Sequence, residues 1–158
     1  MKKLDTVNAR SARLGVILAL AGMLAMPAAI AQMKVNLSLS GGAEVPPVKT
    51  AASGSGEFWV AADHTLSGKF SVTGMNATAA HIHEGAMGSD GPVIIRLVKG
   101  SDGSFSVPPG TKLTDAQYAA FQAGKLYVNV HSEAHPSGEI RAQLSAGGAP
   151  ASSMGSGY

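Results

Sequence analysis

The feature that most constrains this fold is a series of short segments in which apolar and polar residues alternate. Residues 33–40 are the clearest case. Single polar residues there separate Val35, Leu37 and Leu39. A period of two places the apolar side chains on one face of a strand, as in a half-buried antiparallel sheet. Further strands are predicted at residues 56–62, 66–73, 79–83, 93–98, 104–107, 125–131 and 138–144.

Glycine and proline separate these segments, since the 158 residues include 20 glycines and 8 prolines. One helix is predicted after Thr114, which forms a capping box with Gln117, and Gly124 marks the end of that helix. Short strands at regular intervals and a single helix predict an all-β fold. We expect an antiparallel Greek-key β-sandwich or flattened barrel with one short helical insertion.

The first 31 residues differ in character from the rest of the chain. Four basic residues precede an apolar run at residues 14–26, and the small residues Ala29 and Ala31 follow it. This order is typical of a secretory signal peptide, cleaved after Ala31. The run has thirteen residues, fewer than the roughly 20 that span a bilayer, so no membrane-spanning anchor is expected. We therefore expect an exported protein, periplasmic or secreted.

The chain without this leader is close to neutral. Removing residues 1–31 leaves eight basic and nine acidic residues, a net charge of about −1 with neutral histidines. No cluster of lysine and arginine remains, so nucleic-acid binding is not expected. The chain has no cysteine, which excludes disulfides and thiolate ligands. We predict a signal peptide at residues 1–31, one domain at 32–144 and a flexible tail rich in Gly, Ala and Ser at 145–158.

Histidines are the side chains that suggest a chemistry. His81 and His83 are two residues apart on a predicted strand, so their imidazoles project from the same face while Ile82 points into the core. His131 lies on the outward face of a later strand, in phase with Tyr127. If the two strands are neighbours, His131 completes a site of three imidazoles. The alternative is that these histidines are ordinary polar residues on a solvated face.

His135 is a candidate fourth ligand, provided that the turn after His131 folds back. The carboxylates of Glu84, Asp90 and Glu133 are predicted to accept hydrogen bonds from imidazole N–H groups and thereby to orient the rings. Met87 could add a soft ligand for Cu(I), or it could cover the core as a loop methionine. A site made of imidazoles without thiolates suits copper, with zinc as the alternative.

Several motifs of the chain match a known family. They are residues 41–48 (GGAEVPPV), 80–85 (AHIHEG), 91–93 (GPV), 124–131 (GKLYVNVH) and 135–141 (HPSGEIR). With these motifs in this order, the chain resembles the CHRD domain, a module named after chordin that also occurs singly in exported bacterial proteins. The family's pattern has a glycine where this chain has Ala142. The resemblance implies a CHRD domain over residues 32–144 and does not by itself imply an activity.

The histidines also resemble, more distantly, the copper ligands of copper/zinc superoxide dismutase. His81, His83 and His131 match a His-x-His-Glu segment and a later strand histidine of that family, in order and in context. This resemblance implies the superoxide-dismutase-like form of the sandwich, with an immunoglobulin-like form as the alternative. No histidine lies between His83 and His131, so the bridging imidazole and the zinc loop of that family have no counterpart.

Three functions follow from these features. The first is an exported protein that binds, stores or delivers copper through a metal site of His81, His83, His131 and His135. The second is a non-catalytic module that binds a protein or a surface polymer.

The third function is a copper enzyme of the dismutase type, which would need a cation such as Arg96, Lys99 or Arg141 near the metal. The sequence does not show where any of these cations lies relative to the histidines. No hydrolase motif of the Gly-x-Ser-x-Gly or HExxH type occurs, and we assign no catalytic residue.

Overall fold

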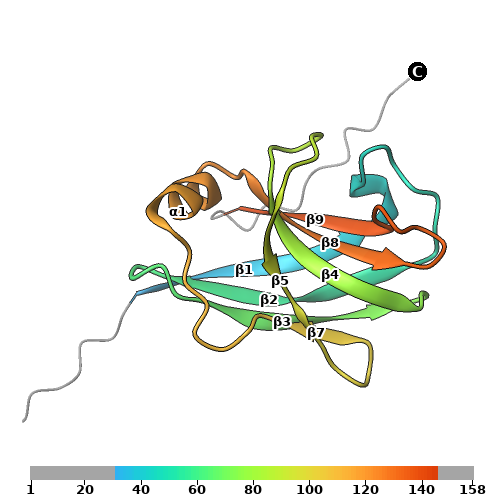
Figure 1. Cartoon of the computed structure of the whole chain (residues 1–158), viewed down its shortest axis with the longest axis horizontal. Coiled ribbons are helices and arrows are strands. Elements are labelled where there is room, and N and C mark those ends of the chain that lie inside the picture. Colours follow the sequence, from blue (N-terminus) through green and yellow to red (C-terminus); the bar gives the residue numbers. More distant parts are fainter. Residues whose placement is uncertain (1–30, 146–158) are drawn as a thin grey trace, which may run out of the picture.

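The computed structural model describes residues 31–145 and is almost entirely antiparallel β-sheet (Figure 1). Within this range one α-helix, α1 (Asp115–Gln122), and one turn of 3-10 helix, η1 (Gly41–Ala43), accompany nine strands. The strands are β1 (Gln32–Ser40), β2 (Ser53–Ala61), β3 (Leu66–Thr73), β4 (Ala77–Glu84), β5 (Val93–Arg96), β6 (Val98–Lys99), β7 (Ser104–Ser106), β8 (Leu126–Ser132) and β9 (Ile140–Leu144). The prediction of an all-β antiparallel fold with one short helix is confirmed.

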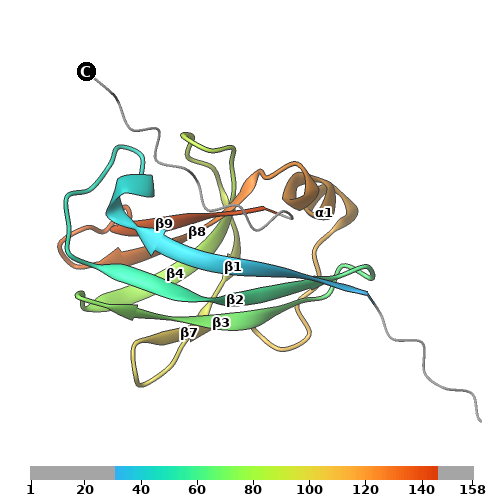
Figure 2. The same ribbon diagram turned by 180° about the vertical axis from the view of Figure 1, so that it is seen from behind.

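The nine strands form one sheet that nearly closes on itself. Its order is β5-β4-β8-β9-β1-β2-β3-β7-β6. Its two edge strands, β5 and β6, follow each other in the chain with only Leu97 between them, and the Leu97 N–H donates to the carbonyl of Ala80 (3.0 Å). One bent strand therefore joins the two ends of the sheet. The result is a flattened barrel in which β4, β8 and β9 face β1, β2, β3 and β7 (Figures 1 and 2).

The interior of the barrel is filled by the apolar side chains that alternate along the strands. Val35, Leu37 and Leu39 of β1 are buried, as their spacing predicts. Phe70 packs between two other phenylalanines, with ring centroids 6.1 Å from Phe58 and 5.6 Å from Phe105. Burial of this apolar surface stabilises the fold.

The helix begins and ends where the sequence predicts. The Gln117 N–H donates to the Thr114 hydroxyl (3.2 Å), and the Thr114 N–H donates to the Gln117 side-chain carbonyl (2.9 Å), which completes the capping box. Gly124 follows with a φ of 67°, a left-handed conformation that favours glycine at a helix end. Phe121 is the side chain that anchors the helix in the core.

The outer face of β8 and β9 is also buried, whereas alternation of apolar and polar residues predicts strands that are buried on one face only. Tyr127, Asn129 and Arg141 are 2%, 3% and 1% exposed. Two connecting segments cover them. Residues 41–52 contribute Glu44, which accepts a hydrogen bond from Asn129, and residues 85–91 lie against Arg141. Polar side chains thus occupy a second buried layer outside the barrel.

No helix of the described residues is long and apolar enough to span a lipid bilayer. The signal peptide predicted for residues 1–31 and the tail predicted for residues 145–158 lie, apart from one residue each, outside the described range.

Candidate metal centre

Three histidines meet on the outer face of two neighbouring strands. Strands β4 and β8 pair antiparallel, and in this register His83 lies opposite Tyr127 and His131 lies opposite Ala79. Outward-facing side chains of adjacent strands are neighbours, so the imidazoles of His81, His83 and His131 gather. His81 Nδ1 lies 3.0 Å from His131 Nε2, and one ring nitrogen of each histidine lies within 4.8 Å of the others. The convergence predicted for these three residues is therefore present.

Backbone carbonyls orient two of the three rings. His83 Nδ1 donates to the carbonyl of Gly91 (2.9 Å), and His131 Nδ1 donates to the carbonyl of Pro136 (2.9 Å). Because a carbonyl only accepts, the proton of each neutral ring sits on Nδ1 and the lone pair on Nε2. His83 Nε2 is buried and has no hydrogen-bond partner among the described residues. A buried acceptor without a partner is costly, and a metal ion is one species that could satisfy it.

The third ring, His81, is placed between a donor and an acceptor. Arg96 lies opposite His81 on β5, and its Nη1 lies 3.3 Å from His81 Nε2. A guanidinium has only donors, so His81 Nε2 accepts and His81 Nδ1 donates to His131 Nε2. The sequence alone did not show whether Arg96 lies near the histidines. The pairing of β4 with β5 puts it beside the histidines.

Two of the three histidines, His81 and His131, are held in the neutral state that metal binding requires. Burial, followed by the neighbouring charges of His131, Arg96 and His83, lowers the pKa of His81 to about 4. Burial and His83 also lower the pKa of His131, and they outweigh the hydrogen bond to Pro136, which raises it. Protons therefore compete weakly for the ring nitrogens of His81 and His131 at neutral pH.

The predicted role of nearby carboxylates is wrong. Glu84 and Glu133 are exposed and make no hydrogen bond to an imidazole, and Asp90 pairs instead with Arg141 at 3.3 Å. The loops at 85–91 and 133–138 fold back so that their backbone carbonyls reach the rings first. Every residue carries a carbonyl, so no sequence pattern marks Gly91 or Pro136 for this role.

The other candidate ligands lie outside the group of three. The converging nitrogens do not include those of His135, whose backbone N–H donates to the Ser132 hydroxyl (3.1 Å) within the turn. Its role as a fourth ligand stays a prediction. Met87 is 65% exposed in its loop. His64 occupies a turn with a φ of 69° and stacks on Tyr118, with ring centroids 4.1 Å apart.

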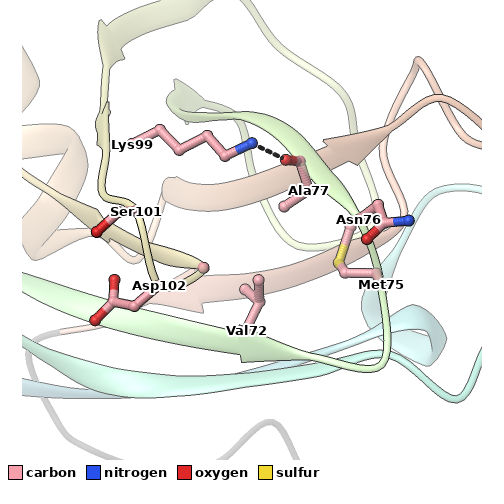
Figure 3. A pocket seen from close by; sticks show the side chains of 8 residues that line it. Val72, Met75, Asn76, Ala77, Lys99, Ser101 and Asp102 are labelled. Carbon is pink, nitrogen blue, oxygen red and sulfur yellow. Dashed lines mark hydrogen bonds between the residues drawn. The ribbon is translucent and has the colours of Figure 1, made fainter.

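A pocket of about 360 Å³ opens near the start of β4 and holds none of the three histidines (Figure 3). Its charged groups are engaged within the chain. The Lys99 ammonium donates to the carbonyl of Ala77 (2.6 Å), and the Asp102 carboxylate accepts from the Ser104 hydroxyl. The residues that line it are Val72, Met75, Asn76, Ala77, Lys99, Ser101, Asp102 and Gly103.

Glu44 is a buried carboxylate in the polar layer next to the histidines. It is 6% exposed, and its Oε1 accepts from Asn129 Nδ2 (2.6 Å). Burial raises the pKa of Glu44 to about 7, although the charge of Arg141 and the hydrogen bonds of Val45 and Asn129 oppose this rise. Glu44 therefore changes its charge near neutral pH.

Replacing Glu44 with glutamine is expected to change how stability depends on pH. The folded state holds the Glu44 proton more tightly than the unfolded chain, so this stabilisation is complete below pH 4.5 and is lost as the pH rises through about 7. His81 acts in the opposite direction, since its lowered pKa costs stability as the pH falls from 6.5 towards about 4. The unfolding free energy of Glu44→Gln relative to wild type should therefore rise from about pH 5 to about pH 8 in urea titrations.

Asp102→Asn is the control for this comparison. A hydrogen bond from Ser104 lowers the pKa of Asp102, so this group is ionised over the whole range and its difference from wild type should stay constant. A constant difference for Glu44→Gln as well would contradict the assignment of Glu44.

Comparisons with known proteins give one match. A family model described as the CHRD domain matches residues 35–144. Neither the curated proteins nor the solved structures contain a match to the chain.

Proposed function

The chain belongs to the CHRD domain family, and from that premise we propose that it is an exported domain that binds one metal ion through His81, His83 and His131. The observation that carries this proposal is the buried Nε2 of His83, which has no hydrogen-bond partner among residues 31–145, on one of three histidines whose ring nitrogens lie within 4.8 Å of one another. A binding role, in storage or delivery of the ion, needs no further residue.

Copper is the metal that we propose, with zinc as the alternative. The candidate ligands are all imidazoles, which suit both ions, and the general order of affinities places Cu(II) above Zn(II). Three protein ligands also leave a coordination position for water, for His135 or for a ligand from another molecule. The Nδ1–H bonds of His83 and His131 support this assignment, because metal-bound histidines commonly donate their other N–H to a carbonyl or carboxylate.

Binding would displace one proton within the site. In the structure the proton on His81 Nδ1 points at His131 Nε2. A cation shared by the three rings would take the place of that proton, so His81 would move its proton to Nε2 or turn its ring. Arg96, which donates to Nε2, would then have to withdraw.

Export is proposed on the signal peptide and on the family. Residues 1–31 have the order of a secretory leader, and CHRD domains are typical of extracellular proteins. A domain outside the cytosol does not compete with cytosolic metal buffers, so a site of moderate affinity can be filled there.

The test is a titration of the purified exported protein, first freed of metal, with Cu(II) and separately with Zn(II) against a competing chelator. We expect one ion of either metal per chain, and tighter binding of Cu(II). Tighter binding of Zn(II) would overturn the choice of copper. Failure of both ions to bind stoichiometrically would overturn the metal site and favour the non-catalytic interaction module, for which the exposed Val93 (41%) and Val98 (51%) offer apolar contacts.

A further inference from the structure

The loop at residues 85–91, between β4 and β5, is held down by a buried cation from another strand. Arg141 of β9 is 1% exposed. Its guanidinium donates to the carbonyls of Ala86 (3.3 Å) and Ser89 (2.8 Å) and to the carboxylate of Asp90 (3.3 Å). A planar group with several fixed donors can hold three acceptors of one loop at the same time.

The same arginine lies against the aromatic ring that supports His83. Strand β8 lies between β4 and β9, so Tyr127 of β8 has His83 on one neighbouring strand and Arg141 on the other. The His83 and Tyr127 rings stack with centroids 4.8 Å apart and planes 10° apart. The Arg141 Cζ lies 3.4 Å from the centroid of the Tyr127 ring, within the range of a cation–π contact.

Two hydrogen bonds of Gly91 link the loop to both stacked rings. The Gly91 N–H donates to the Tyr127 hydroxyl (3.1 Å), and the Gly91 carbonyl accepts from His83 Nδ1 (2.9 Å). Gly91 lies so close to the backbone of Glu84 that a Cβ at this position would clash with the Glu84 carbonyl oxygen. His83 is therefore oriented by a loop that Tyr127 and Arg141 hold in place.

We propose that Tyr127 and Arg141 are positioning residues for the metal site, and that metal binding is coupled to closure of the 85–91 loop. This inference rests on the proposed function, because it requires His83 to be a ligand. The coupling follows from linkage. If the closed loop aims His83 Nε2 at the other histidines, then closure favours the metal, and a bound metal must favour closure by the same factor.

Tyr127→Phe is the sharpest test, since it removes the hydroxyl that binds Gly91 and keeps the ring that stacks on His83. We expect Cu(II) affinity, measured in full-length protein by chelator competition, to fall about tenfold, within the range seen when an outer partner of a metal ligand is lost. Tyr118→Phe is the matched control, because Tyr118 stacks on His64 and belongs to α1. Its affinity should equal that of wild type.

Amide hydrogen exchange distinguishes a positioning role from a purely structural one, because a purely structural role would not change the metal-dependent protection of the loop. In wild type, Cu(II) should slow exchange of the amides at residues 85–91, and Tyr127→Phe should lose most of this metal-dependent protection. Asp90→Ala tests the contact between Arg141 and the loop without disturbing the core, because the Asp90 side chain is 70% exposed. It should reduce the protection in the same direction. Asp115→Ala, which removes a fully exposed carboxylate on α1, should not.

The outcomes separate the two proposals. Binding of Cu(II) by wild type, with unchanged affinity and unchanged loop protection in Tyr127→Phe and Asp90→Ala, would overturn the positioning role and leave the metal site standing. A wild-type protein that binds neither Cu(II) nor Zn(II) would overturn the metal site, and the positioning role would fall with it.

Discussion

Replacing His83 with alanine is expected to weaken Cu(II) binding by at least about 100-fold, more than the loss of an outer partner of a ligand costs. Among residues 31–145 the Nε2 of His83 is a buried nitrogen without a hydrogen-bond partner, so its removal takes away the ligand that gains most from the ion. The double variant His81→Ala/His83→Ala should abolish stoichiometric binding, because only His131 of the three rings remains.

His64→Ala is the matched control for this experiment. His64 stacks on Tyr118 and lies outside the group of three, so chelator competition should give a wild-type affinity for this variant. Urea unfolding of the metal-free variants separates a lost ligand from a lost fold. A double variant that is folded and binds Cu(II) as tightly as wild type would show that the ion binds elsewhere in the chain.

Replacing Arg141 with methionine is expected to destabilise the fold by about 3 kcal/mol or more, the usual cost when one partner of a buried charge cluster is removed. Methionine fills part of the volume but offers no donor to the carbonyls of Ala86 and Ser89. It also leaves buried Glu44 without the cation that lowers its pKa. Urea unfolding with the m-value checked for two-state behaviour measures the effect.

The pH dependence of the stability of this variant gives a second, independent test of the role of Arg141. Without Arg141 the pKa of Glu44 should rise above its wild-type value of about 7, so the folded state gives up that proton at a higher pH. The destabilisation should therefore be larger at about pH 8 than at about pH 5, because ionising Glu44 in the folded state becomes more costly. Arg96→Met, which removes an exposed arginine, should change stability by less than about 0.5 kcal/mol. Equal stability losses for the two variants would contradict the role assigned to Arg141.

The elements of the barrel were largely predictable because their patterns are local. The inward residues of β1 and the capping box at Thr114 and Gln117 act within a few residues of chain, and all of them are found as predicted. The closure of the sheet into a barrel was harder to predict from the sequence. It depends on a single strand that bends at Leu97 and pairs with β4 on one side and β7 on the other.

The second face of β8 shows why a period of two is not enough to assign exposure. Tyr127 was predicted to lie on the outward face of its strand, and Asn129 lies on the same face, yet both are nearly fully buried. The segments that cover them come from residues 41–52 and 85–91, and nothing within β8 indicates that they will do so. Alternation identifies two faces, whereas burial of the second face depends on contacts between distant parts of the chain.

The spacing of His81 and His83 by itself determined that two imidazoles share a face, because neighbouring side chains on any strand point to opposite sides. Only the tertiary structure decided that His131 joins them, since that requires β4 to pair with β8 in one register. It also decided that carbonyls of Gly91 and Pro136, and not carboxylates, orient the rings. The physical reason is that side-chain direction along a strand is a local property, whereas strand partners and the folding of loops over a site depend on the free energy of the whole chain.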